Sequence, residues 1–319
     1  MSVSDSSVQP IQVCPLCGSR AAPAPHGSGA AAIAQCTDCG LVMRHPQPSD
    51  ATLRAIYGPG YFFGAGDPPL EAATSALKSA TADGYLDALE RYRGPLDRGS
   101  AAPRLLDVGC GHGDLLVRAR ARGYDVHGVD VSADAVQRVQ ARLGSAAATR
   151  DGAGDLSALQ GAFDVCVLSD VIEHARNPAV LLGHVRRVLA PGGTLLISTP
   201  SITHWTARLL KRHWMEFKEE HLFYFDPQTI ERLLRQGGFD QLSITSSWKT
   251  LSLDYLGAHF RRFPVPLLRP IVTGLQRLTP PAIRRRPFPL PTGGIVVLAR
   301  SSPESAPDTR HDFANRPVR

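Results

Sequence analysis

The stretch RLLDVGCGHGD, residues 104–114, decides the fold of this chain of 319 residues. It begins with a short apolar run, which predicts a buried strand of a parallel sheet. Gly109, Gly111 and Gly113 follow at alternate positions, and glycine lets a backbone turn sharply and approach a ligand closely. The residues up to Gly123 then have the pattern of a helix. A strand, a glycine loop and a helix in this order form the place where an open α/β sheet binds a nucleotide-like ligand.

The residues around this loop narrow the choice of ligand. A dinucleotide site has a third glycine where this chain has Asp114, and a carboxylate is a poor neighbour for a pyrophosphate. The same carboxylate is tolerable for a ligand that carries an ammonium and a sulfonium group. Residues 124–130, YDVHGVD, predict a second strand that ends at Asp130, where an acid could bind two ribose hydroxyls.

Four blocks occur in order between residues 102 and 301: LLDVGCGHGD, GVDVS, FDVCVLSDVIEH and LAPGGTLLISTP. With these blocks the chain resembles the class I S-adenosylmethionine-dependent methyltransferases. The resemblance implies an α/β fold, a Rossmann-like doubly wound sheet of seven strands, with S-adenosylmethionine as the cofactor. It also implies that the last two strands, residues 242–250 and 294–299, are antiparallel at the sheet edge.

The resemblance further implies a set of cofactor-binding residues at the ends of the first strands. They are Asp107, Gly109, Gly111, Gly113, Asp130, Asp151 and Ser169. Asp107 would orient the ammonium group through the loop and water, and Asp130 would bind the ribose. The acid near the adenine is either Asp151 or Asp155, because the glycine-rich DGAGD allows both registers. Asp151 is preferred because it directly follows the expected strand.

The segment SDVIEH, residues 169–174, lies beside the sulfonium and the incoming acceptor in the family that the chain resembles. A hydroxyl acceptor needs a group that takes its proton, and histidine is the natural choice near neutral pH. The candidate catalytic residues are therefore His174 and, within the aromatic-rich stretch 200–225, His221. The aromatic stretch YGPGYFF, residues 57–63, either covers a pocket or docks the N-terminal part on the core.

Two matching CxxC pairs near the N-terminus predict a zinc site. Cys14, Cys17, Cys36 and Cys39 supply four thiolates, and a glycine follows each pair. Four thiolates close a tetrahedron and leave no open position, so a structural zinc is expected. The alternative is a pair of reduced turns without metal. Residues 21–34 are rich in Ala, Pro and Gly and predict a loop between the pairs.

The cysteine pairs and the 57–63 stretch ahead of such a core are similar to bacterial methyltransferases that act on sugars, glycans and related metabolites. The chain departs from the sugar C-methyltransferases among them because it lacks their extra C-terminal domain. The resemblance implies transfer of a methyl group to a small-molecule, sugar, glycan or lipid-linked acceptor, most simply at oxygen. Two alternatives remain: a catalytically silent zinc-ribbon scaffold, and a Rossmann dehydrogenase, which Asp114 disfavours.

The composition and charge of the chain limit which binding partners are expected. The chain has a net charge of +6 and 43% hydrophobic residues, with no apolar run long enough to span a bilayer. Paired CxxC motifs without a secretory signal predict reduced thiols and a cytoplasmic protein. The arginines near the cysteines are scattered, so no nucleic-acid partner is expected. Residues 251–291 hold seven arginines among apolar residues and prolines, and this segment is either a solvated face or a contact with an anionic membrane.

The expected organisation has four parts. They are a zinc-ribbon module at 10–60, a helical linker or cover at 61–101, a methyltransferase domain at 102–300 with an insert at 251–291, and a disordered tail at 301–319. Within the cover, residues 70–93 predict a helix in two pieces. The oligomeric state and the identity of the acceptor stay open at this point.

Overall fold

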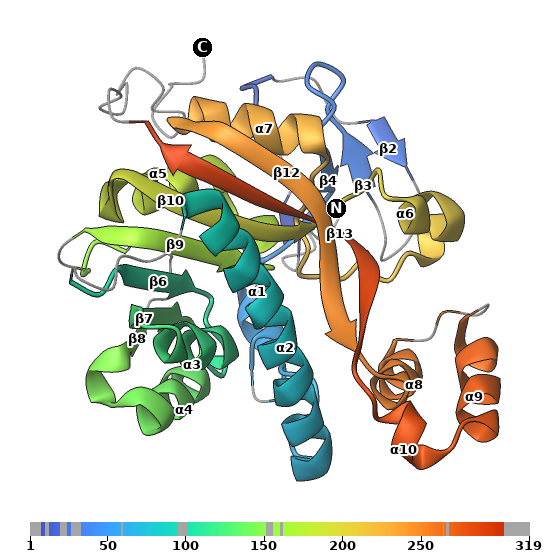
Figure 1. Ribbon diagram of the computed structural model, residues 1–319. Coiled ribbons are helices and arrows are strands. Elements are labelled where there is room, and N and C mark those ends of the chain that lie inside the picture. The colour runs from blue at the N-terminus through green and yellow to red at the C-terminus, as the bar shows by residue number, and fades with distance from the viewer. Residues whose placement is uncertain are drawn as a thin grey trace.

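The structure is a computed structural model that describes residues 8–9, 13–19, 24–26, 33–58, 60–94, 101–150, 156–159, 162–263, 265 and 268–302. Its central feature is a seven-stranded sheet in the order β12-β13-β10-β9-β6-β7-β8 (Figure 1). The strands are β6 (Arg104–Val108), β7 (Asp125–Asp130), β8 (Ala148–Arg150), β9 (Phe163–Ser169), β10 (Leu189–Pro200), β12 (Phe239–Leu251) and β13 (Phe288–Ser301). β13 runs antiparallel to both β10 and β12, and the other pairs are parallel. The predicted Rossmann-like doubly wound sheet is confirmed.

Helices cover both faces of this sheet. On one face lie α2 (Pro68–Arg93), α3 (Asp114–Ala121) and α4 (Ala133–Leu143), and on the other lie α5 (Pro178–Val188) and α7 (Pro227–Gln236). Neighbouring residues of β6 show why: Leu105 packs with the first group and Leu106 with the second, since side chains alternate along a strand. Burial of both residues places β6 in the centre of the molecule, and its carboxyl end carries the glycine loop.

Polar side chains cap the starts of two of these helices. The Ser132 side chain accepts from Ala135 N at the start of α4, and Asn177 caps α5 ahead of Pro178. α5 stops at Val188, and the residues that follow are already extended as the beginning of β10. Pro191, Gly192 and Gly193 therefore lie in β10 and do not end the helix.

The predicted break in the N-terminal helix is wrong, because α2 is continuous over 26 residues. Asp67 caps its start, and its buried positions include Tyr85, Leu86 and Leu89, which pack on the sheet and on α3. Arg122, just after α3, also binds the Asp83, Asp87 and Glu90 carboxylates of α2. Tertiary packing along one whole face therefore stabilises α2 as a single helix, although its local sequence suggests a break.

A second, four-stranded sheet has the order β11-β4-β3-β2. Its strands are β2 (Ala24–His26), β3 (Ile33–Gln35), β4 (Val42–Arg44) and β11 (Phe223–Tyr224), and all pairs are antiparallel. The loop predicted at 21–34 is therefore wrong in part, because β2 and the start of β3 fall within it. β11 comes from the stretch between β10 and α7, so this sheet joins the cysteine-bearing segment to the rest of the molecule.

The remaining elements are short. β1 (Val8–Gln9) pairs with β5 (Gln47–Pro48), and α1 (Asp50–Ile56) leads into the aromatic stretch. α6 (Trp205–Leu210) follows β10, and single 3-10 turns, η2 (Ser145–Ala147), η3 (Ile172–His174) and η4 (Lys211–His213), occur at connections. No helix in the described part of the chain is long and apolar enough to cross a membrane.

β12 and β13 extend beyond the sheet as a twisted ribbon, up to the pair Leu251 and Phe288 (Figure 1). The tip of the ribbon carries α8 (Leu253–Arg262), α9 (Leu268–Leu278) and α10 (Pro281–Arg284). Both strands are longer than predicted, so the helical part of the insert is shorter than 251–291. Ser301, expected in the tail, is the last residue of β13, and the residues after 302 lie outside the described part.

We predict that Leu89→Ala lowers the free energy of unfolding by about 3 kcal/mol, because Leu89 is fully buried between α2 and the sheet and its loss leaves a cavity. Urea unfolding followed by circular dichroism measures the change. The control is Leu209→Ala, at a leucine of α6 that is 65% exposed, for which the loss should stay within about 0.5 kcal/mol. Equal losses in the two variants would contradict the assigned packing.

Candidate active site

The glycine loop after β6 adopts a conformation that only glycine tolerates well. Gly109, Gly111 and Gly113 have φ angles of +73°, +50° and +79°. A Cβ atom on Gly109 would lie 2.5 Å from Val171 Cγ2, and one on Gly113 would lie 2.8 Å from Val139 Cγ2. The three positions predicted for the cofactor are thus brought together in one tight turn at the start of α3.

Asp130, at the end of β7, holds this turn in place. Its Oδ2 accepts a hydrogen bond from Gly111 N at 2.8 Å, and its Oδ1 accepts one from Ser132 N at 2.8 Å. Gly109 N also donates to Val129 O of the same strand end, at 2.7 Å. The carboxylate therefore orients the loop, and it lies at the edge of the crevice where the sequence predicted that it binds a ribose.

Asp107 is buried at the end of β6. Burial, followed by the nearby charges of Asp130 and Asp114, raises the pKa of its carboxyl to about 8. Its Oδ1 has no hydrogen-bond partner among the described residues. A buried carboxyl of this kind is largely neutral at pH 7, and a cationic group nearby would favour its ionised form. Asp151 and Asp155, the alternatives for the adenine, lie outside the described residues.

Asp114 has a structural role that its position in the motif did not indicate. Its Oδ1 accepts from Ser75 Oγ of α2 at 2.6 Å and from Arg142 Nη1 of α4 at 3.1 Å. The carboxylate in the place of a third glycine therefore ties α2 and α4 to the start of α3. This contact sets α2 beside the crevice.

The aromatic residues of the stretch 57–63 extend across the site. The Tyr57 hydroxyl lies 2.9 Å from His174 Nδ1, and the Phe62 ring lies 4.3 Å from the His112 ring, next to Gly111. Phe63 packs against Tyr255 of α8, with ring centres 5.1 Å apart. The stretch was expected either to cover a pocket or to dock the N-terminal part on the core. These contacts favour the first interpretation, a cover that runs from the glycine loop to the insert.

The two histidines chosen from the sequence lie side by side. His174 ends η3 and His221 precedes β11, and their ring centres are 4.7 Å apart. Burial lowers the pKa of His174 to about 4, and burial together with the Lys218 charge holds the pKa of His221 well below its ordinary value. Both imidazoles are therefore neutral at neutral pH and able to accept a proton. Their role as bases stays a prediction.

Glu173 completes this buried group. Its Oε2 accepts from Thr199 Oγ1 at 3.0 Å, and burial and the Asp170 charge raise its pKa to about 8. One ligand atom each from Glu173, His174 and His221 lie within 4.8 Å of one another. Two imidazoles and a carboxylate at this spacing can share a proton, and they are also a donor set that can hold a divalent cation.

The sequence did not indicate the charged groups beside these histidines. Ser169 ends β9, and the next residue, Asp170, has a φ of +55°, which is unusual for a residue other than glycine. Lys249 Nζ of β12 lies 2.5 Å from Asp170 Oδ2, and Lys218 Nζ lies 3.2 Å from Glu216 Oε2. The Lys249 side chain is half-buried, with 31% of its surface accessible to solvent.

The sequence contained a signal for one of these charged groups, Asp170. Asp170 directly follows a predicted strand within SDVIEH, at the sheet edge where ligands bind, so its position could have been recognised. Lys249 gave no such signal. It reaches the site because the long strand β12 lies beside β13, far from the glycine loop in sequence.

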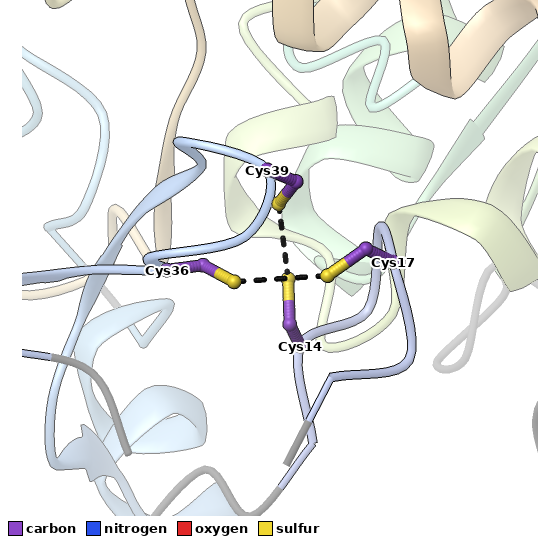
Figure 2. A group of neighbouring side chains, drawn as sticks. All are labelled: Cys14, Cys17, Cys36 and Cys39. Atoms are coloured by element: carbon purple, nitrogen blue, oxygen red, sulfur yellow. Dashed lines mark hydrogen bonds between the residues drawn. The ribbon is translucent and has the colours of Figure 1, made fainter. Parts of the chain in front are cut away.

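The four N-terminal cysteines form one cluster (Figure 2). The Sγ atoms of Cys14 and Cys39 are 3.5 Å apart, and those of Cys17 and Cys36 are 3.6 Å apart. A tetrahedral zinc with bonds of about 2.3 Å needs sulfurs about 3.8 Å apart, so the cluster fits a zinc ion. A hydrogen bond from Cys14 lowers the pKa of Cys39 to about 5, which favours a thiolate.

The cysteine-bearing segment supports the segment that carries Lys218 and His221. Arg44, the last residue of β4, donates from Nη2 to Lys218 O at 2.7 Å and from its main-chain N to Leu222 O at 2.9 Å. Phe223 and Tyr224 of β11 pair with Met43 and Val42 of β4. His221 and Lys218 therefore stand on a segment that the β3–β4 hairpin holds, and Cys36 and Cys39 lie in the turn of that hairpin.

A glycine loop after the first central strand, an acid at the tip of the next strand and a buried polar site beyond the fourth and fifth strands define the class I methyltransferase arrangement. Residues 77–244 match the family described as "Methyltransferase domain". The chain belongs to this methyltransferase family.

Curated relatives agree with this assignment. The chain is 28% identical over 206 residues to a ubiquinone biosynthesis O-methyltransferase of Cereibacter sphaeroides, covering 54% of this chain and 81% of that protein. It is 33% identical over 195 residues to the protein of the same name from Roseobacter denitrificans, covering 52% and 78%. The protein is thus a methyltransferase that uses S-adenosylmethionine, and the dehydrogenase alternative is wrong.

Among solved structures, a SAM dependent methyltransferase from Archaeoglobus fulgidus aligns over 71% of this chain and 94% of that one. The TM-score is 0.47 and the sequence identity is 17%.

We predict that S-adenosylhomocysteine binds more tightly as the pH rises from about 6 to 7.5, by up to about tenfold per pH unit. The pKa of Asp107 is raised to about 8 in the ligand-free chain, so its neutral form prevails below that pH, and an ammonium group prefers the carboxylate. Calorimetric titration at each pH measures the affinity. Asp107→Asn should bind with a flat pH profile, and an equal slope in this variant would contradict the assignment.

We also predict that the protein purified under reducing conditions contains one zinc ion per chain, and that Cys36→Ser loses it. Because the β3–β4 hairpin holds the segment of His221, methyl transfer should fall by about a hundredfold, more than the affinity for S-adenosylhomocysteine. Elemental analysis and a methyl-transfer assay measure the two effects. Cys166→Ala, at a buried cysteine of β9 outside the cluster, should keep its zinc.

Proposed function

We propose that the protein transfers the methyl group of S-adenosylmethionine to a hydroxyl oxygen of a small-molecule acceptor that carries a ring. The observation that carries the proposal is the pair of neutral imidazoles of half-buried His174 and buried His221, whose ring centres are 4.7 Å apart. A hydroxyl must lose its proton as its oxygen takes the methyl group, and a neutral imidazole can accept that proton. The O-methyltransferase names of the curated relatives support oxygen as the acceptor atom.

The side chains around the histidines support an acceptor with a ring. Tyr57, Tyr61 and Phe62 form a chain of edge-to-face contacts on one side, and Tyr255 and His259 stack on the other. Aromatic walls of this kind suit the face of a sugar or of an aromatic ring. A sugar, a glycan-linked or a lipid-linked acceptor therefore fits the proposal as well as a free metabolite does.

The chain's own residues supply placement and proton transfer. The sulfonium of the cofactor provides the methyl group, and the reaction is an in-line displacement that depends on alignment. Gly109, Gly111 and Gly113 let the backbone approach the cofactor, and Asp130 fixes the loop. The Tyr57 hydroxyl contacts His174 Nδ1 and holds this imidazole beside that of His221. The cover at 57–63 excludes water.

Labelled transfer tests the proposal. The protein is incubated with S-adenosylmethionine that carries a tritiated methyl group and with a fractionated cell extract, and the labelled product is identified. We expect a labelled methyl ether. Label on nitrogen or carbon would contradict the proposed acceptor atom, and binding of S-adenosylhomocysteine without any transfer would favour the scaffold alternative.

We predict that His174→Ala and His221→Ala each lower the turnover of the labelled acceptor by about a hundredfold or more, because the proton of the hydroxyl loses its acceptor. Calorimetry with S-adenosylhomocysteine should show nearly unchanged cofactor binding in both variants. His184→Ala, at a histidine of α5 that is not part of the pair, is the matched control and should keep its turnover. Unchanged turnover in both site variants would refute the role of the histidines and leave methyl transfer itself intact.

A further inference from the structure

The positive charge of this protein is concentrated in one segment. Residues 251–291 contain seven arginines and one acid, Asp254, which is a net charge of +6 and equals that of the whole chain. The remainder of the chain is electrically balanced. Asp254 pairs with Arg284 at 3.2 Å and with Arg285 at 3.8 Å, and it is the one acid that the segment offers to its arginines.

The same segment exposes large apolar side chains. Ile271, Leu275 and Leu278 of α9 are 58%, 48% and 84% exposed, and their spacing places them on one face of the helix. Ile283 of α10 is 55% exposed. Burying such side chains in the protein would be the ordinary outcome, so a helix that shows an apolar face to solvent indicates a surface that binds something.

The packing of α9 on α8 fixes which face points outward. A Cβ on Gly257 of α8 would collide with the Gln276 side chain, whose Nε2 donates to Leu253 O at 3.1 Å. Val272, one turn before Gln276, is buried against the same side. Ile271, Leu275 and Leu278 lie about a third of a turn around the helix from Val272 and Gln276, on its exposed side. Arg284 Nη1 donates to Gln276 O at 3.0 Å and fastens α10 to α9.

We propose that this surface, formed by Ile271, Leu275, Leu278 and Ile283 with the exposed arginines Arg269, Arg277, Arg285 and Arg286, docks the protein on an anionic membrane. An apolar helix face bordered by arginines is suited to lie in the plane of a lipid surface, with its apolar side chains among the acyl chains and its cations at the phosphates. Figure 1 shows α8, α9 and α10 together at the end of the β12–β13 ribbon, away from the central sheet.

α8, on which α9 packs, contacts the cover. Phe63 of the cover packs against Tyr255 and His259 of α8, and Arg262 Nη2 donates to Gly60 O at 3.3 Å. The helices that carry the proposed surface are therefore joined to the cover through α8. Membrane docking does not depend on the proposed chemistry, and it can be tested in the absence of any acceptor.

Co-sedimentation with lipid vesicles tests the proposal. The full chain is mixed with vesicles of phosphatidylcholine, with or without roughly one third phosphatidylglycerol, at about 0.15 M salt. We expect pelleting with the anionic vesicles, no pelleting with the neutral ones, and weaker binding as the salt concentration rises. Absence of pelleting with anionic vesicles, or equal pelleting with both kinds, overturns the proposal.

Substitutions test which residues contact the anionic membrane. A variant with Arg277→Gln, Arg285→Gln and Arg286→Gln should bind about a hundredfold more weakly, since each arginine near an anionic surface contributes about fivefold. Leu278→Asp should also weaken binding strongly, and because Leu278 is 84% exposed the fold should survive, with an unchanged melting temperature. The matched control is Arg54→Gln, Arg91→Gln and Arg232→Gln, three exposed arginines of α1, α2 and α7. Equal binding of the control and the insert variant would overturn the assigned surface.

A second copy of the chain is the competing occupant of the apolar face. Light scattering on the protein without lipid distinguishes the two. We expect the protein without lipid to have the same assembly state before and after the Leu278→Asp substitution. A larger assembly that this variant dissociates would assign the face to self-association and overturn the membrane proposal.

Discussion

The main-chain pairing of β4 with β11 is the constraint on which the acceptor site depends. It joins the cysteine-bearing segment to the stretch that holds Lys218 and His221, so that two distant parts of the chain form one sheet. Hydrogen bonds from Arg44 reinforce the pairing at both Lys218 and Leu222. A metal in the cysteine cluster then acts on chemistry indirectly, because it stabilises the hairpin against which the acceptor wall is built.

The cofactor side depends on a different kind of constraint. Here the Asp130 carboxylate holds the loop by accepting hydrogen bonds from two main-chain N–H groups. Asp114 connects the following helix, α3, to α2 and α4. These contacts join residues no more than 39 positions apart, and each includes a residue of a recognisable motif. The acceptor side instead gathers residues from the segment after α1, from η3 and the residue after β9, from the segment before β11, and from β12 and α8. This difference is common in a fold whose cofactor site is shared and whose acceptor site varies.

The two sides also differ in how well the sequence predicted them. The glycine loop, Asp130 and the seven-stranded sheet follow from motifs and from strand patterns, because their geometry is decided locally. Lys249 could not be predicted, since it reaches Asp170 only through the pairing of β12 with β13. The same holds for β11, a strand of two residues that has no pattern of its own and exists because β4 lies beside it. The continuity of α2 likewise reflects tertiary packing over its whole length.

The cover at residues 57–63 has a consequence for the order of events in a catalytic cycle. Phe62 lies on Gly111 and Tyr57 binds His174, so one short segment touches both the place of the methyl donor and the place of its target. Any molecule that rests on Gly111 competes with the Phe62 ring for space. Entry of the donor and departure of the demethylated by-product therefore require this segment to swing aside, and the speed of that opening sets an upper limit on turnover.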